Sequence, residues 1–153
     1  MTVHTDDFTV RRRSAFAALS VATAAELDAG FLAIKPLPAV EDIRPAEIGM
    51  VMLRGRIGGT GQPFNVGEAT VTRAAIRLQD GTTGFGYRLG RAPQLTRISA
   101  IIDALWQTPR WTAIIERDVL SPIRERLARD ARAKAEVTAA TRVEFFTLVR
   151  GED

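Results

Sequence analysis

Cysteine is absent from this chain of 153 residues, and histidine occurs once, as His4. Without cysteine the chain contains no disulfide, no thiolate metal site and no cysteine nucleophile. A zinc site would have to consist of carboxylates alone, contrary to the ligand preference of zinc, and a Ser-His-Asp triad would need His4 to reach back into a site. The sequence therefore argues against metal binding and against catalysis by histidine or cysteine. A cysteine-free chain suits a reducing compartment, so we expect a cytoplasmic location.

Long hydrophobic runs are also absent, so we expect no segment that crosses a membrane. The N-terminal stretch places arginines at positions 11–13 ahead of an alanine-rich segment, which is the order found in export signals. However, Asp6 and Asp7 precede the arginines, and Glu26 and Asp28 interrupt the apolar part. This stretch therefore predicts an amphipathic helix and not an export signal.

Lysine is scarce, since only Lys35 and Lys134 occur, and the net charge of +3 depends almost wholly on arginine. The planar guanidinium suits phosphate and carboxylate groups. An arginine-rich genome composition would give the same excess, so both interpretations stay open. Nucleic-acid binding would require several aromatic residues interleaved with basic residues on a strand face. The single pair Tyr87-Arg88 does not form such a pattern. We expect no nucleic-acid partner.

The first half of the chain predicts a helix followed by an extended connector. Residues 1–9 are expected to form a flexible tail. From Thr9 to Ala29 the apolar residues recur at spacings of three and four, which predicts a helix that ends near Gly30. The prolines of KPLPAV, residues 35–40, predict an extended connector, because proline resists both helix and central strand.

The middle of the chain predicts an antiparallel meander over residues 49–90. Residues 49–53 form a short apolar run, residues 68–78 alternate in polarity, and residues 84–90 form a glycine-rich strand. Asp80-Gly81 is a strong hairpin signal between the last two. A fourth strand near Val40 is an alternative.

The last part predicts helices and a terminal strand. Residues 93–108 carry an apolar stripe with Pro93 in the first turn. A second helix begins at Trp111, and Ser121-Pro122 is interpreted as the N-cap and first position of a third. Residues 142–151 predict a C-terminal strand, with a helical continuation as the alternative. Together these elements predict one α+β domain over residues 1–153, in which a small antiparallel sheet packs with an N-terminal helix and two or three C-terminal helices.

The stretch RGRIGGTGQPFNVGEATVTR, residues 54–73, is unusually rich in glycine and arginine. It is not a Walker A loop, because no lysine lies between Lys35 and Lys134. It is not a dinucleotide-binding fingerprint either. Phe64 occupies the place of the third glycine. The fingerprint also requires a helix directly after the loop, and Pro63 and the alternating residues that follow it argue against a helix there.

Two interpretations of this loop remain open. Consecutive glycines can direct several backbone N–H groups at one anion, with Arg54 and Arg56 on the same face of a strand beside it. Alternatively, the glycines serve turn geometry or let another backbone approach. Glu47, Glu68 and Asp103 are acid–base candidates by residue type, and Glu68 is the best placed. No two of these carboxylates form a pair at a meaningful spacing, so we assign no catalytic residue. The candidate anion-binding or interface loop comprises Arg54, Arg56, Gly58, Gly59, Thr60, Gly61, Asn65, Glu68 and Arg73.

Several short motifs follow one another in a fixed order: RPAE at 44–47, IGGTG at 57–61, GEAT at 67–70 and DG at 80–81. This run resembles the PhnG family, the G subunits of the bacterial carbon–phosphorus lyase core complex. Similarity resumes at residues 102–105 and at 142–151, so it covers nearly the whole chain. The chain departs from the family at Phe16, where the first helix of the family carries tryptophan, and over residues 92–100.

The resemblance implies a subunit of an enzyme complex that degrades phosphonates. In that family the G, H and I subunits are associated with displacement of adenine from ATP by a phosphonate, which gives a ribose 1-phosphonate 5-triphosphate. The I subunit is associated with nucleosidase-like chemistry, and the J subunit with cleavage of the C–P bond. The expected partners are therefore the I subunit foremost, and also H and J.

The resemblance transfers no catalytic residue to this chain. We therefore expect a structural or site-completing role, no cofactor of its own, and ATP or phosphonate only at a site shared with partner subunits. The alternative is a free-standing anion- or nucleotide-binding module that uses the glycine-arginine loop.

Overall fold

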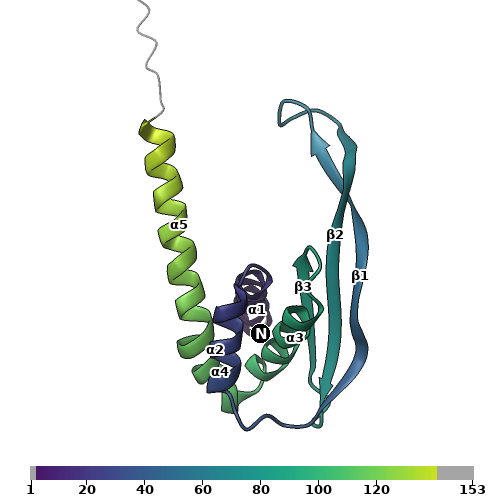
Figure 1. The fold of residues 1–153 in the computed structure, drawn as a ribbon, viewed down its shortest axis with the longest axis vertical. Helices are drawn as coiled ribbons and strands as arrows, with labels where there is room; N and C mark the ends of the chain where they lie inside the picture. Colours follow the sequence, from purple (N-terminus) through teal and green to yellow (C-terminus); the bar gives the residue numbers. More distant parts are fainter. Residues whose placement is uncertain (1–2, 141–153) are drawn as a thin grey trace, which may run out of the picture.

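A computed structural model describes residues 3–140 (Figure 1). The predicted C-terminal strand, residues 142–151, lies outside the described residues. The elements in chain order are α1 (Val3–Ser20), α2 (Ala24–Ala33), β1 (Val40–Arg56), β2 (Pro63–Leu78), β3 (Thr83–Leu89), α3 (Pro93–Trp106), α4 (Pro109–Ile115), the π-helical turn η1 (Glu116–Leu120) and α5 (Ser121–Ala140). This order confirms the predicted α+β class, because a central group of strands is preceded and followed by helices along the chain.

The sheet has three antiparallel strands in the order β1-β2-β3. The short strand predicted at 49–53 and the fourth strand considered near Val40 are both parts of the single long strand β1. Pro45 fits within it because β1 is an edge strand and its register shifts on both sides of Arg44. The hairpin predicted at Asp80-Gly81 is confirmed: Gly81 has φ 88°, and the Thr82 N–H donates to the Asp80 carboxylate.

Helix α3 packs directly on the backbone of β3. A Cβ placed on Gly84 would lie 2.0 Å from the carbonyl oxygen of Ala100, and one on Gly86 would lie 2.0 Å from that of Thr96. No side chain fits at those distances, so the glycines of β3 are required by the close approach of the helix. The core forms around this contact, and its fully buried members include Leu19, Leu27, Ile76, Leu105 and Ile115.

The N-terminal region forms two helices, whereas the sequence predicted one. Thr23 starts α2 with a capping box, in which its hydroxyl accepts the Glu26 N–H while the Glu26 carboxylate accepts the Thr23 N–H. Gly30 does not end a helix. It lies inside α2, where a Cβ would meet Val119 at 2.8 Å, so it permits close packing on η1.

Helix α1 starts earlier than predicted. Residues 3–9 belong to this helix, although the sequence predicted a flexible tail there. The ring of Phe8 packs against Trp106 at a centroid distance of 5.6 Å, which ties this first part of α1 to α3.

The predicted N-cap at Ser121 is wrong, because α4, η1 and α5 are continuous. The backbone N–H and the hydroxyl of Ser121 both donate to the Glu116 carbonyl, five residues earlier. This π-type turn lies immediately before Pro122, which has no N–H to donate, and it carries the helix past the proline.

Two arginines fasten the helices to the rest of the molecule. Arg88 on β3 donates to the carbonyls of Leu19 and Ala22 at the C-terminal end of α1, at 2.6 and 2.5 Å, where the helix dipole favours a cation. Burial lowers the pKa of Arg88. Arg126 on α5 binds both carboxylate oxygens of Glu26, at 2.7 and 3.0 Å, and so joins α5 to α2.

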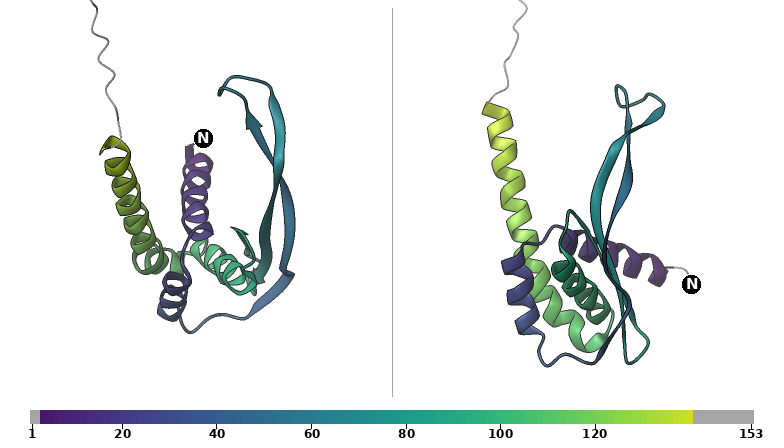
Figure 2. Two further views of the ribbon diagram at one scale, coloured as in Figure 1. Left: turned by 45° about the horizontal axis from the view of Figure 1, so that its top comes forward. Right: turned by 45° about the vertical axis from the view of Figure 1, so that its right-hand side comes forward.

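The helices that pack on the three-stranded part of the sheet, together with that part, form what we call the body. Two elements extend away from the body on the same side (Figures 1 and 2). One is the far half of α5, and the other is the distal part of the β1–β2 hairpin. The hairpin leaves the body because β3 pairs with β2 only from Val71 to Arg77. We call residues 48–70 the arm. None of these residues is buried.

Alanine at Gly84 should destabilise the protein by at least about 2 kcal/mol, because the new methyl group would push α3 off β3. Urea unfolding of Gly84→Ala measures the loss. Gly49→Ala is the matched control, since a Cβ at Gly49 meets nothing within 4 Å, and it should change stability by less than about 0.5 kcal/mol. Equal effects of the two substitutions would contradict the packing argument.

The hydrogen bonds from Arg126 lower the pKa of Glu26 from 4.5 to about 2. Because this pKa is lower in the folded state, its stabilisation is complete above pH 4.5 and is lost as the pH falls towards 2. Glu26→Gln should therefore lower the melting temperature at neutral pH, and the difference from the native chain should vanish near pH 2. Asp28→Asn, an exposed change on the same helix, is the control. A difference that persists unchanged to low pH would contradict this assignment.

Candidate functional site

The glycine-rich loop lies at the tip of the arm and joins β1 to β2. Gly58 and Gly59 have φ of 61° and 78°, and a Cβ on either would meet nothing within 4 Å. Both residues are therefore needed for turn geometry and not for packing within the chain. The Gly61 N–H donates to the Ile57 carbonyl at 3.0 Å, and Arg56 Nη1 donates to the Gly61 carbonyl at 3.2 Å. This loop closes on itself and exposes its backbone.

The structure brings together only part of the predicted site. Arg54, Arg56 and the loop residues Gly58 to Gly61 lie at the tip, and Asn65 pairs with Arg54 across the hairpin. Glu68 pairs with Met52 further down the arm. Arg73 lies ten residues beyond Pro63 on the same strand, which corresponds to roughly 30 Å.

Arg73 takes part in a separate cluster of charges beside the body. Its Nε donates to Glu47 Oε1 at 2.7 Å, and Arg44 Nη1 lies 3.5 Å from the same oxygen. All three side chains are about half exposed, so this cluster contributes little to stability. Arg73 therefore belongs to the base of the arm and not to the loop.

The arm exposes an apolar surface. Seven of its large hydrophobic side chains are 44–74% exposed: Ile48, Met50, Met52, Leu53, Ile57, Phe64 and Val66. The register places Ile48 opposite Thr72 and Met50 opposite Thr70, so these side chains share a face with Thr72. In the body this face is covered by α3, whereas along the arm no described element covers it. A two-stranded hairpin of this kind is marginally stable in water by itself.

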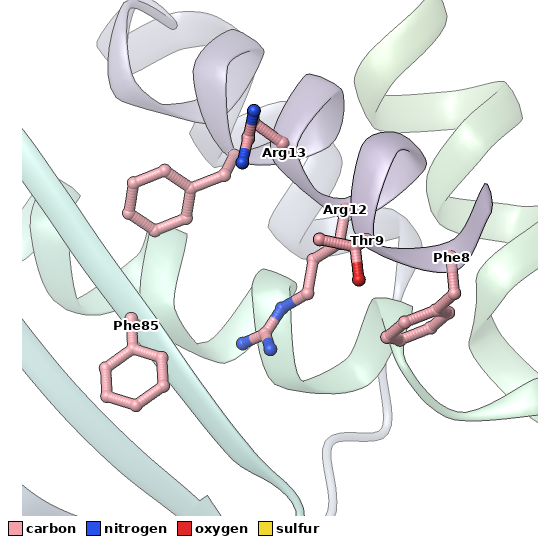
Figure 3. A pocket seen from close by; sticks show the side chains of 6 residues that line it. Phe8, Thr9, Arg12, Arg13 and Phe85 are labelled. Carbon is pink, nitrogen blue, oxygen red and sulfur yellow. The ribbon is translucent and has the colours of Figure 1, made fainter. Parts of the chain in front are cut away.

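A pocket of about 390 Å³ lies between α1 and β3 (Figure 3). It is lined by Phe8, Thr9, Arg12, Arg13, Phe16 and Phe85. The α1 residues among these recur at spacings of four, which is the sequence signal for one helical face. The sequence analysis predicted the helix from apolar residues after Thr9 and did not use this spacing. It missed the pocket because Phe85 comes from a distant strand.

A buried carboxylate holds one of the residues that line the pocket. Asp103 on α3 is 1% exposed, and it accepts Arg12 Nε at 3.1 Å and Arg12 Nη2 at 2.7 Å. The same carboxylate accepts the backbone N–H of Phe85 at 2.9 Å. The hydrogen bonds to Asp103 raise the pKa of Arg12. Sequence reasoning named Asp103 as an acid–base candidate by residue type, but the structure shows that its oxygens are engaged by Arg12 and Phe85.

Among the side chains that the structure describes, those of residues 7–140, no group of three His, Cys, Asp or Glu could hold a metal ion. In the same part of the chain, no helix combines the length and apolar character needed to span a bilayer.

The geometry thus presents an exposed apolar arm and an arginine-containing pocket. Comparison with known proteins shows that residues 10–151 match the model of the family described as phosphonate metabolism protein PhnG. The chain is also 48% identical over 143 residues to the alpha-D-ribose 1-methylphosphonate 5-triphosphate synthase subunit PhnG of Rhizobium meliloti (strain 1021), across 94% of this chain and 91% of that protein. The chain belongs to the PhnG family.

Proposed function

We propose that this chain is a subunit of ribose 1-methylphosphonate 5-triphosphate synthase and acts in phosphonate catabolism within a carbon–phosphorus lyase core complex. The observation that carries this proposal is the similarity to the Rhizobium subunit over nearly the full length of both chains. The reaction is the displacement of adenine from ATP by a phosphonate. The chain assists it by structural or site-completing contacts, and it holds no cofactor of its own.

The arm is the docking element for a partner subunit, of which the I subunit is the first candidate and H and J are the others. Its apolar side chains are exposed along a two-stranded ribbon that nothing in the described chain covers. Burial of such a surface against a partner would stabilise both the arm and the assembly, since hydrophobic burial is the main favourable term in association. The glycine tip suits this role, because a bare backbone can approach another chain closely.

The tip also completes a site for ATP or phosphonate that is shared with a partner. Arg54 and Arg56 lie beside the exposed backbone of Gly58 to Gly61. Arg56 already contacts the loop carbonyl of Gly61, whereas Arg54 forms no ion pair with any side chain of residues 7–140, the ones that the structure describes. Guanidinium groups at an interface bind phosphoryl oxygens strongly once water is excluded.

Charged residues on the arm should disrupt assembly without unfolding the chain. Met50 and Met52 are 69% and 53% exposed, so Met50→Asp and Met52→Asp should alter the stability of the chain by less than about 0.5 kcal/mol. Copurification with a tagged I subunit should fall about tenfold or more, because a carboxylate would be buried in the interface. Leu32→Asp, at a 64% exposed position on α2, is the control. If only the control disrupts assembly, docking lies on the helical body.

Removal of the tip arginines should weaken the use of ATP in the assembled complex. Arg54→Ala and Arg56→Ala should each raise the KM for ATP or for methylphosphonate by about tenfold while the complex still copurifies. Adenine release measures turnover. Arg77→Ala, an exposed change on β2 outside the arm, should leave both constants unchanged. Unchanged kinetics in all three variants would exclude an anion-binding role for the tip.

The free-standing module makes a different prediction for the isolated chain. A nucleotide-binding module should show a rise in melting temperature with added ATP, whereas the proposed shared site requires a partner and should show none.

A further inference from the structure

The pocket between α1 and β3 plays no part in the proposed docking or in the tip site. Its walls include the rings of Phe8 and Phe16 from α1 and of Phe85 from β3, and its volume is about 390 Å³. Figure 3 shows Arg12 extending from α1 into the space between Phe8 and Phe85. An apolar pocket of a few hundred Å³ with a small number of convergent polar groups is the usual form of a small-molecule site.

Arg12 is held in place as a hydrogen-bond donor. Its Nε and Nη2 are bound to the buried Asp103, and its Cζ lies 5.8 Å from the centroid of the Phe85 ring. Its Nη1 donates no hydrogen bond to any of the residues that the structure describes. Since the guanidinium is fixed by Asp103, its Nη1 edge can bind a ligand without losing further side-chain freedom.

Arg13 gives the pocket its net charge. The charge of Arg12 is balanced by Asp103, and no Asp or Glu lines the pocket. Arg13 is exposed and forms no ion pair with the side chains that the structure describes, those of residues 7–140. The pocket therefore combines aromatic walls, one fixed guanidinium edge and one uncompensated positive charge.

We propose that this pocket binds a small organic oxyanion with a planar aromatic body, such as an aromatic carboxylate or an aromatic phosphonate. The ring of the ligand packs among Phe8, Phe16 and Phe85, and its oxyanion accepts hydrogen bonds from Arg12 Nη1 and from Arg13. Aromatic rings stack favourably on one another, and oxyanions form charge-assisted hydrogen bonds with guanidinium groups. This binding is separate from the proposed function, so either can fail without the other.

The test is a titration of the full-length chain with benzoate and with phenylphosphonate, followed by amide NMR. Both anions should shift the amide resonances of Arg12, Arg13 and Phe85. Benzamide, which keeps the ring but carries no charge, and methylphosphonate, which carries charge but no ring, should each bind at least about tenfold more weakly. If the chain is obtained only with its partners, ligand-observed NMR on the assembly makes the same comparison.

Matched variants assign the binding to this pocket. Arg13→Gln should raise the Kd for benzoate about tenfold, whereas Arg129→Gln, at an exposed arginine on α5, should leave it unchanged. Phe85→Leu is at a half-exposed position, so the fold should be retained while the preference for benzoate over acetate is lost. Equal binding of benzoate and benzamide, equal effects of Arg13→Gln and Arg129→Gln, or no binding of either aromatic anion at millimolar concentration would overturn the proposal.

Discussion

The body of the molecule depends on one buried carboxylate. Asp103 joins elements that are far apart in sequence, since it binds the Arg12 side chain of α1 and the Phe85 backbone of β3 from its position on α3. Its charge is almost wholly removed from water, so it requires both partners: an unpaired buried charge costs about 3–5 kcal/mol. The glycines of β3 make this geometry possible, because they let α3 approach closely enough for Asp103 to reach the Phe85 N–H.

Beyond the body, β1 and β2 continue as a two-stranded ribbon whose apolar side chains no described element covers. The face of β2 that carries Ala74 and Ile76 lies in the core, and the register extends it to Ile48 and Met50 on the arm, where both are exposed. An apolar face that runs from a core into solvent is characteristic of a surface that another chain covers. This physical property of the arm accords with membership of a family that includes a synthase subunit.

Much of the fold was predictable from local patterns. The helix starting at Pro93, the alternating strand around Val71 and the Asp80-Gly81 turn each depend on residues within a few positions of one another, and the structure confirms them. The break between α1 and α2 also has a local signal, since Thr23 and Glu26 have the spacing of a capping box. The sequence analysis nevertheless predicts a single helix over both, because the apolar spacing continues through the break. The Ser121-Pro122 prediction was wrong, since the π-turn that accommodates Pro122 has no local signature.

The sequence by itself determined the α+β class, the placement of the strands between an N-terminal and a C-terminal helical region, the Asp80-Gly81 turn and the likeness to a known family. These features follow from short-range periodicity and from the order of motifs along the chain. Only the tertiary structure decided that Gly84 and Gly86 serve packing while Gly58 and Gly59 serve a turn, that Arg12 meets Asp103 across 91 positions, and that the arm leaves the body. The physical reason is that burial and pairing depend on which distant segments come into contact, and no local pattern specifies that.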